Sequence, residues 1–260
     1  MAYKYKKIKC NSSNYYPIKR DKTNIKNIVI HFTGNAKGDT AIANGNYFAR
    51  GDRNASAHDF VDDKEVVNSV PYNYIAWHCG GGLQDQGSPY KNEGAKKHGK
   101  VTNTNSIGVE MCDCIKDTKN NLSADTRANA ATHISKLLKK FKICPDNIYR
   151  HFDVTGKLCP IYFVTNESDW NDFKVEIWLK YLKFNKKIDV ESGKFLIKKL
   201  QSRLNEICIP NRKKLVVDGN YGNNTRYYVL AYWKMIGWNN GTKYDGWTDG
   251  YKTLKKLKLL

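Results

Sequence analysis

The chain has 260 residues, which is enough for one full domain and a smaller second one. A hydrophobic fraction of 40% and an aromatic fraction of 12% are typical of a folded protein and argue against extensive disorder. No stretch approaches the ~18 consecutive apolar residues of a membrane-spanning helix, so we expect no membrane insertion. The formal net charge of +19 predicts an acidic partner, either a nucleic acid, an anionic membrane or an acidic polymer such as the teichoic polymers of bacterial walls.

The basic residues are mostly lysines, since only 8 of the 44 Lys and Arg residues are Arg. Lysine is a flexible point charge, whereas the reading of base edges and the bidentate binding of phosphates favour Arg. We therefore expect no specific recognition of nucleic acid.

The cysteines and the N-terminus both indicate folding in a reducing compartment. Seven cysteines are an odd number and follow no disulfide spacing, so most are predicted to be buried thiols and any special one a ligand or nucleophile. The first nine residues, MAYKYKKIK, contain no apolar segment of a secretory signal. We expect synthesis in the cytoplasm, and release by another agent if the protein acts outside the cell.

Strands and helices alternate along the first 182 residues. The run IKNIVIHF at 25–32 predicts a buried strand that ends near His31, and Ser123 is placed to cap a helix with apolar residues at helical spacing. Strands are expected at 25–32, 56–61, 65–70 and 106–112, and helices at 40–50, 123–140 and 167–182. This order predicts an α/β domain around one central sheet.

A charged, apolar-poor stretch at 183–190 predicts a boundary between a domain at 1–182 and another at 183–260. The second domain should contain helices at 192–207, 225–236 and 253–260, and its turn at 218–225 is weakly repeated at 245–253. Residues 181–260 carry a net charge of +11, against +8 for residues 1–180. The smaller domain is therefore far more basic per residue, as a module that attaches to an anionic wall should be.

Two histidines and a cysteine are candidates for a metal site. A zinc hydrolase needs three protein ligands and one open position, and His and Cys both suit zinc. Taken alone, a histidine at a strand end such as His31 is more often a core residue, and a cysteine before proline such as Cys159 is usually a buried thiol. The separate segments therefore leave both interpretations open.

Together, three segments resemble the N-acetylmuramoyl-L-alanine amidase type 2 family, whose relatives include phage amidase lysozymes and animal peptidoglycan recognition proteins. They are VIHF at 29–32, SIGVE at 106–110 and the spacing His151-x5-Lys157-x-Cys159, and the resemblance covers roughly residues 25–165. It implies a central mixed sheet flanked by helices and one Zn²⁺ per chain, bound by His31, His151 and Cys159. Lys157 would lie beside the metal and stabilise the oxyanion.

The same resemblance implies a substrate groove. Ala76-Trp77-His78 matches the family's A-W-H stretch that lines this groove, and His58 belongs to the strand that follows the first ligand. The residues expected to bind substrate are His58, Trp77, His78 and Asn35. The remaining histidines, His98 and His133, are expected at the surface.

One departure from the family bears on the mechanism. A branch of the family has a catalytic Tyr directly before the position of His58, where this chain has Ala57. Another branch uses a Glu on the I-G-x-E strand, and this chain has Glu110 there. We therefore predict Glu110 as the general base, the alternative being a carboxylate that is merely ion-paired at the end of a sheet.

The C-terminal region resembles the three-helix peptidoglycan-binding domain, through Leu200-Gln201-x2-Leu204 and the turn at 217–225. The resemblance implies a small all-α domain with an aromatic-rich pocket. Its candidates are Tyr221, Tyr227, Tyr228, Trp233 and Trp247, of which Trp233 is better explained as part of the core.

The resulting hypothesis is a zinc-dependent amidase that hydrolyses the bond between N-acetylmuramic acid and L-alanine in bacterial peptidoglycan. We expect a phage endolysin that is made in the host cytoplasm and reaches the cell wall after holin-dependent release. The alternatives are a host autolysin and a non-catalytic peptidoglycan receptor. Receptors of this family typically lose the cysteine ligand, whereas Cys159 is present here. No feature of the sequence indicates an oligomeric state.

Overall fold

The computed structural model describes residues 3–35, 39–80, 82–85, 87, 89–112, 122–185, 193–207, 213–237 and 256–257. The chain divides into two compact units, one of residues 1–143 and 147–177 and the other of residues 144–146 and 178–260. The predicted boundary at 182/183 and the division at 177/178 both fall inside helix α5 (Glu167–Asn185).

The first unit is built on a six-stranded sheet with the order β1-β5-β4-β7-β3-β8. Neighbouring strands are parallel except β4 and β5, which form an antiparallel pair. The strands are β1 (Lys4–Lys7), β3 (Asn27–Phe32), β4 (Asp59–Val61), β5 (Glu65–Asn68), β7 (Ser106–Met111) and β8 (Ile148–Arg150). A separate antiparallel pair consists of β2 (Tyr15–Tyr16) and β6 (Ile75–Ala76).

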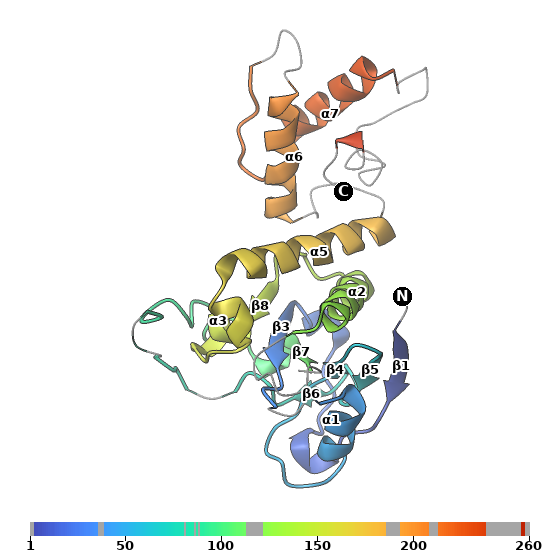
Figure 1. Ribbon diagram of the computed structural model, residues 1–260, viewed down its shortest axis with the longest axis vertical. Coiled ribbons are helices and arrows are strands. Elements are labelled where there is room, and N and C mark those ends of the chain that lie inside the picture. The colour runs from blue at the N-terminus through green and yellow to red at the C-terminus, as the bar shows by residue number, and fades with distance from the viewer. Residues whose placement is uncertain are drawn as a thin grey trace. The chain divides into compact units, whose positions relative to one another are not determined.

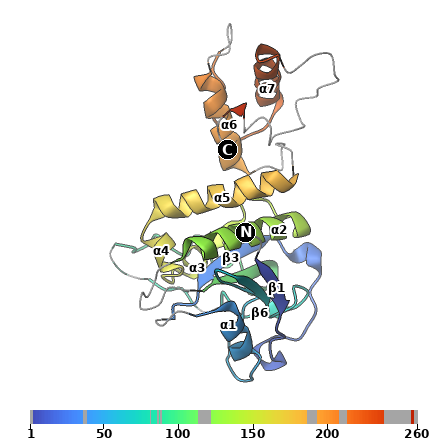
Figure 2. The same ribbon diagram turned by 45° about the vertical axis from the view of Figure 1, so that its right-hand side comes forward.

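Helices cover both faces of the sheet (Figures 1 and 2). Helix α2 and the first part of α5 lie on one face, where Arg127 of α2 forms ion pairs with Asp169 and Glu176 of α5. Helix α1 packs on the other face, against β4 and β5. The helices of this unit are α1 (Ala41–Phe48), α2 (Ala124–Phe141), α3 (His151–Thr155), α4 (Ile161–Val164) and α5, with 3₁₀ turns at Ser12–Asn14, Lys22–Asn24 and Asn103–Asn105. The expected α/β fold with a central mixed sheet is confirmed.

Local sequence signals explain both ends of α2 and the start of α1. The Ser123 side chain accepts a hydrogen bond from the backbone N–H of Thr126, and Lys142 in the left-handed region ends α2. The Thr40 side chain accepts in the same way from Ala43 at the start of α1. The predicted helix at 123–140 therefore differs from the observed one by a single residue at each end.

Strand β1 was not predicted from the sequence. Its four residues, KYKK, are all exposed and pair in parallel with β5 at one edge of the sheet. Charged side chains are common on edge strands, where they replace the alternation of apolar and polar residues that reveals a half-buried strand.

The surface position expected for His133 is wrong. Its ring is buried and its Nε2 lies 3.0 Å from Oδ2 of Asp59, a carboxylate that is itself fully buried on β4. His133 lies on the same side of α2 as the buried Ala130 and Leu137, three residues before it and four after it, so the helix carries the histidine inward to an acidic partner. His98, by contrast, is exposed as expected.

The second unit contains helices α6 (Lys194–Glu206) and α7 (Asn223–Met235). Their apolar faces form one core with Leu215, Tyr221 and Leu257, and Trp233 lies inside it, which confirms the core interpretation of that residue. The second copy of the predicted repeat, with Trp247, lies outside the described residues. So does the predicted helix at 253–260, apart from residues 256–257.

Within the described part of the chain, no helix is both long enough and apolar enough to span a bilayer.

Candidate metal centre

The pairing of β3 with its two neighbours brings three predicted site residues together. His31 on β3 is in register with Glu110 on β7, and Ile30 is in register with Arg150 on β8. His151 follows Arg150 directly and begins α3, so it lies beside His31 on the side opposite Glu110. Residues in register share a face of a parallel sheet, so the His31 and Glu110 side chains point the same way.

The three predicted ligands converge in the first unit. The Nδ1 atoms of His31 and His151 lie 3.1 Å apart, and the Cys159 Sγ lies 3.9 Å from the His31 Nδ1. All three donor atoms lie within 4.8 Å of one another, and all three side chains are buried. Tetrahedral zinc with two imidazole ligands and one thiolate ligand places its donor atoms about 3.3 Å and about 3.6 Å apart. The His31–His151 and His31–Cys159 separations each lie within a few tenths of an ångström of these values.

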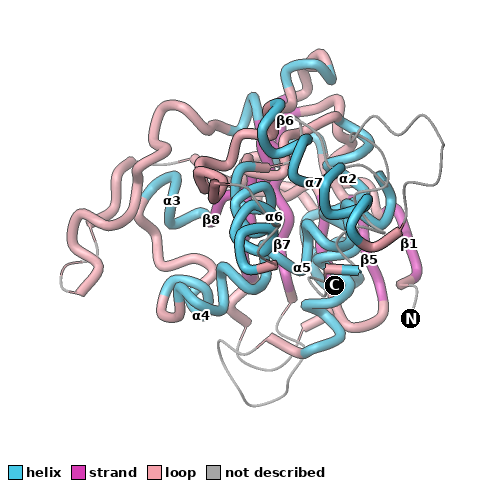
Figure 3. The backbone as a smooth tube through the Cα atoms, turned by 90° about the horizontal axis from the view of Figure 1, so that it is seen from above, coloured by secondary structure: helices cyan, strands magenta, loops and turns pink. Residues whose placement is uncertain are grey.

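A single helical turn positions the second and third ligands. Helix α3 has five residues and ends at Gly156, whose φ of +87° favours glycine. A Cβ on Gly156 would lie 1.9 Å from the carbonyl oxygen of Gln84, so the backbone at residue 84 passes too close for any side chain. Figure 3 shows α3 beside the end of β8. The chain then turns back, and the N–H of Phe152 donates to the carbonyl of Cys159 at 2.9 Å. This turn explains how His151 and Cys159, which are only eight residues apart in the sequence, reach the same site.

Arg150 fixes the start of the same turn. Its guanidinium donates to Asp153 at 2.8 Å, to Glu167 at 2.6 Å and to the backbone carbonyl of Phe163. Asp153 also accepts from the Arg150 backbone N–H. This clamp holds α3 at the end of β8 and thus orients His151.

The electrostatic surroundings favour neutral histidines. Burial, followed by the charges of His151, His78 and Lys157, holds the pKa of His31 well below its usual range. Burial and the Lys157 ammonium lower the pKa of His151 to about 4. Neutral imidazole is the form that binds a metal ion, so both side chains are ready to act as ligands at neutral pH.

A pocket of ≈ 510 Å³ is lined by three more of the residues predicted to belong to the site, namely Glu110, Lys157 and Asn35. The exposed Asn35 donates from Nδ2 to Oδ2 of Asp39 at 2.6 Å, and Asn44 of α1 donates to the same oxygen at 2.7 Å. Asp39 and Asn44 line the pocket as well, and neither was predicted as a site residue. A short polar loop before a helix carries no sequence signal that distinguishes such a role.

The structure places His58 and His78 inside the protein, and neither lines this pocket. His58 is fully buried, with its Nδ1 accepting from the backbone N–H of Gly108 at 3.1 Å. The Nδ1 of His78 lies 3.1 Å from the Nε2 of His31. Trp77 is half-buried and packs edge-on against Tyr16, with ring centroids 5.4 Å apart. Of the predicted substrate-binding residues, Asn35 lines this pocket, whereas His58, Trp77 and His78 do not.

Arg20 is a buried residue that was not predicted to have a role in the site. Its guanidinium donates to the backbone carbonyls of Tyr72, Asn103, Thr104 and Ser106 at 2.8–3.0 Å, and its Nη2 lies 2.9 Å from the His58 Nε2. A lone arginine in a polar N-terminal segment gives no local indication of such a role, because all its partners are distant in sequence.

Residues 21–161 match the protein family described as N-acetylmuramoyl-L-alanine amidase. This match covers more than half of the chain and includes the whole His31–His151–Cys159 cluster. The chain therefore belongs to the N-acetylmuramoyl-L-alanine amidase family.

Curated relatives carry the same description. The N-acetylmuramoyl-L-alanine amidase BlyA of Bacillus subtilis is 35% identical over 159 residues, which are 60% of this chain and 42% of BlyA. A probable N-acetylmuramoyl-L-alanine amidase of Bacillus licheniformis is 31% identical over 235 residues, covering 82% of this chain and 62% of the relative. The chain thus spans about half the length of these relatives.

Solved structures agree with the fold of the first unit. A mutant endolysin from Bacillus subtilis superposes with a TM-score of 0.52 and 25% identity, over 67% of this chain and 99% of the endolysin. The catalytic domain of XlyA gives a TM-score of 0.51 and 26% identity, over 66% of this chain and 98% of that domain.

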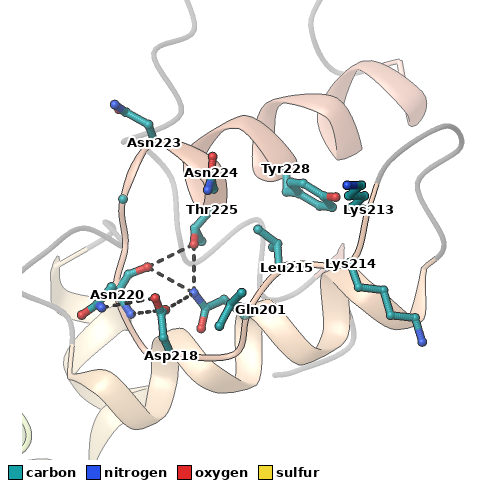
Figure 4. Close-up of a pocket in the computed structure, with 12 residues that line it drawn as sticks. Gln201, Lys213, Lys214, Leu215, Asp218, Asn220, Asn223, Asn224, Thr225 and Tyr228 are labelled. Carbon is teal, nitrogen blue, oxygen red and sulfur yellow. Dashed lines mark hydrogen bonds between the residues drawn. The ribbon is translucent and has the colours of Figure 1, made fainter.

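The second unit has a pocket of its own, of ≈ 490 Å³ (Figure 4). The buried Gln201 of α6 organises its floor, since its Nε2 donates to Asp218 at 2.8 Å, to Thr225 Oγ1 at 3.0 Å and to the carbonyl of Asn220. The backbone N–H of Gly219 donates back to the Gln201 Oε1 at 2.9 Å. These bonds explain why Gln201 and the turn at 218–225 occur together in the sequence.

The aromatic-rich lining expected for the second unit is found only in part. Tyr228 lines its pocket, Tyr227 is exposed, and Tyr221 and Trp233 belong to the core. Lys213 and Lys214 contribute to the lining instead, so the pocket is polar and cationic.

The buried His58 should make the protein sensitive to acid. Burial and the Arg20 guanidinium lower the pKa of His58 from 6.5 to about 3, so the unfolded chain binds more protons than the folded chain between these values. The stabilisation is complete above about pH 6.5 and is lost as the pH falls toward about 3, at about 1.4 kcal/mol per pH unit for this group. Urea unfolding of the chelator-treated chain between about pH 7 and about pH 5 measures this slope.

Two variants distinguish the contribution of His58 to this pH dependence from the contributions of the other histidines. His58→Gln should flatten the slope by about one proton, whereas the exposed His98→Gln should leave it unchanged. Equal slopes in His58→Gln and the unaltered chain would show that His58 is not held neutral in the folded protein.

Proposed function

We propose that this chain is a zinc-dependent amidase that hydrolyses the amide bond between N-acetylmuramic acid and L-alanine in peptidoglycan. The observation that carries the proposal is the buried His31–His151–Cys159 cluster next to a pocket lined by Glu110 and Lys157. Membership of the amidase family and the activity in the names of its relatives support the choice of bond.

The donor set fits zinc better than other common metals. Two imidazoles and one thiolate suit a borderline-soft ion, whereas Mg²⁺ and Ca²⁺ prefer oxygen ligands. Three protein ligands leave a fourth position open, which is the pattern of catalytic sites. Zinc bound there would polarise the scissile carbonyl and lower the pKa of a water molecule toward ~7.

Glu110 has the right position for a general base. It is in register with the ligand His31, its side chain points to the same face, and it lines the adjoining pocket. From there its carboxylate accepts a proton from the attacking water and returns it to the amine of L-alanine as the amide bond breaks. The products are the lactyl carboxylate of the muramoyl sugar and a free stem peptide.

Lys157 supplies positive charge on the same side. Its side chain is exposed and lines the pocket, and its charge is felt by both His31 and His151. In this position the ammonium stabilises the negative charge that develops on the carbonyl oxygen, an effect typically worth ~3–4 kcal/mol per donor. Asn35, held by Asp39, offers an amide for orienting the peptide or sugar.

We assign the activity to lysis of a host cell wall by a phage endolysin, with release from the cytoplasm through a holin. The similarity of the first unit to an endolysin structure supports this assignment. A host autolysin would use the same chemistry. A non-catalytic receptor is disfavoured because the cysteine that such relatives lose is present and converges with both histidines.

The second unit is proposed to hold the enzyme on the wall. Residues 181–260 carry a net charge of +11, and two lysines line the pocket of this unit. Attachment to an insoluble substrate raises the effective concentration of the catalytic unit there, without any new contact at the active site.

Replacing Cys159 by Ser should remove or greatly weaken zinc binding, because a neutral hydroxyl is a far poorer ligand than a thiolate. Metal analysis of the purified chain should find one zinc in the unaltered protein and much less in the variant. Cys10→Ser is the matched control, since Cys10 is equally buried but belongs to another cluster. A fully active, metal-free protein would refute the mechanism.

Replacing Glu110 by Gln should leave zinc bound and lower kcat by about 10²–10⁴, the usual contribution of general acid–base catalysis. The assay is digestion of purified walls, in which new L-alanine amino termini without new reducing sugars identify the bond that is cut. The exposed Glu93→Gln serves as control and should keep normal turnover. Normal turnover of Glu110→Gln would assign the base to another group.

Wall attachment should depend on the pocket of the second unit and not on net charge alone. The double change Lys213→Gln and Lys214→Gln removes two pocket charges, whereas Lys198→Gln and Lys199→Gln removes two exposed charges from α6 outside the pocket. In a pelleting assay with purified walls, both pairs should weaken binding at low salt. Above the screening range of ~0.15 M only the pocket pair should remain impaired. Identical curves for the two pairs would leave diffuse charge as the basis of attachment.

A further inference from the structure

A row of buried polar groups runs back from His31, away from the metal cluster. The Nε2 of His31 lies 3.1 Å from the Nδ1 of His78, and the Nε2 of His78 lies 3.2 Å from the hydroxyl of Ser106. That hydroxyl in turn donates to the backbone carbonyl of Thr102 at 2.5 Å. His31, His78 and Ser106 are 2%, 8% and 0% exposed, so the protein groups in the row must satisfy one another.

The far end of the row sets the direction of its hydrogen bonds. The carbonyl oxygen of Thr102 can only accept a hydrogen bond, so the single hydroxyl hydrogen of Ser106 is donated to it. The Ser106 oxygen then offers a lone pair to His78, whose Nε2 must carry a hydrogen in order to donate. The hydrogen of His78 is thus placed on Nε2 because the Thr102 carbonyl can only accept a hydrogen bond.

The donor and acceptor roles set at Ser106 also determine the roles of the two nitrogens of His78, and through them those of the ligand His31. The His78 ring is only 8% exposed and lies between the His31 ring and the Ser106 hydroxyl, so a charged imidazolium at this position would be costly. A neutral ring with its hydrogen on Nε2 has a bare Nδ1, which accepts from the Nε2–H of His31. The Nδ1 of His31 is then left without a hydrogen, and this is the atom that faces His151 and Cys159.

An independent feature of the backbone makes room for His78. A Cβ on Gly108 would lie 2.5 Å from the Cγ of the His78 ring, so the ring rests directly on the β7 backbone. Successive residues on this face of β7 are Ser106, Gly108 and Glu110. The strand therefore supplies the end of the hydrogen-bonded row, the space for its middle member and, two residues on, the proposed general base.

We propose that His78 is a positioning residue which, with Ser106 and the Thr102 carbonyl, fixes His31 in the tautomer that presents Nδ1 to the metal. The proposal rests on the proposed function only in taking zinc as the ion bound by His31. It gives the histidine of the A-W-H stretch a role behind the metal instead of in the substrate groove. Groups that orient metal ligands in this way typically change metal affinity by about 10–100-fold when they are removed.

The first test measures zinc affinity of the full chain by competition with a chelator. His78→Phe keeps a flat ring but removes the acceptor, and should weaken zinc binding by about 10–100-fold. His78→Asn places an amide oxygen near the position of Nδ1, and should recover most of that loss. His133→Phe is the matched control, because His133 is a buried histidine that pairs with Asp59 on the other face of the sheet. It should leave zinc affinity unchanged even if stability falls.

The second test reads the tautomer directly in the zinc-free chain, by nitrogen NMR of the histidine rings. The unaltered protein should show His31 with its hydrogen on Nε2 and a bare Nδ1. Ser106→Ala removes the acceptor that directs His78, and Gly108→Ala displaces its ring, so both variants should give a mixture of tautomers at His31.

The outcomes separate this proposal from the proposed function. If the unaltered chain binds no zinc, the proposed function fails, whereas the tautomer measurement still decides the role of His78. If zinc binds and His78→Phe matches the unaltered chain, the positioning role is overturned. A hydrogen on the His31 Nδ1 in the unaltered zinc-free chain overturns it as well, even if every His78 variant fails to fold.

Discussion

The parallel pairing of β3 with β7 and β8 determines whether this protein has an active site at all. In this register His31 lies between Glu110 and the start of α3, and its side chain points away from α2. Side chains alternate along a strand, so a slip of one residue would turn His31 toward the opposite face and bring Ile30 to the site. The apolar residues Ile28 and Ile30 on the other face oppose such a slip, because it would expose them. The packing of the core therefore also fixes the catalytic geometry.

The irregular segments around the site depend on buried polar side chains. The 3₁₀ turn at Asn103–Asn105 leads into β7, and Arg20 donates hydrogen bonds to the carbonyls of Asn103, Thr104 and Ser106. Burial lowers the pKa of this guanidinium to about 10, which still leaves it charged at neutral pH. A charged donor among carbonyls is strongly bound only while all its partners stay in place, so this network favours one arrangement of the loop. That loop also carries Thr102 and Ser106, on which the orientation of His78 rests.

Local patterns in the sequence were enough for the main elements of the first unit. The helix after Ser123 and the strand ending near His31 follow from capping and hydrophobic periodicity. These signals are local because each depends on neighbouring residues. Residue type alone left the roles of His31 and Cys159 open. The resemblance to a family supplied what spacing alone left open, namely that the three ligands meet.

Features that depend on distant contacts were not predicted. His133 is buried because α2 happens to face Asp59, and Arg20 is buried because four backbone carbonyls converge on it from two other segments. The short helix α3 is held by Arg150 and by the close approach of residue 84, neither of which a hydrophobic pattern reveals. The burial of His58 and His78 was likewise not predicted, because a family motif marks a position without showing which way its side chain points.

The lysine-rich strand β1 protects the sheet that carries the site. It is the first strand in the sheet order, and its Lys4, Lys6 and Lys7 side chains are exposed, with Lys6 bound to Glu65 of β5 at 2.7 Å. An edge strand offers backbone hydrogen bonds to any other chain that approaches, and a row of like charges repels a second copy of itself. The opposite edge, β8, has only three residues. The lysines of β1 thus discourage edge-to-edge aggregation, in addition to contributing to the basic character of the chain.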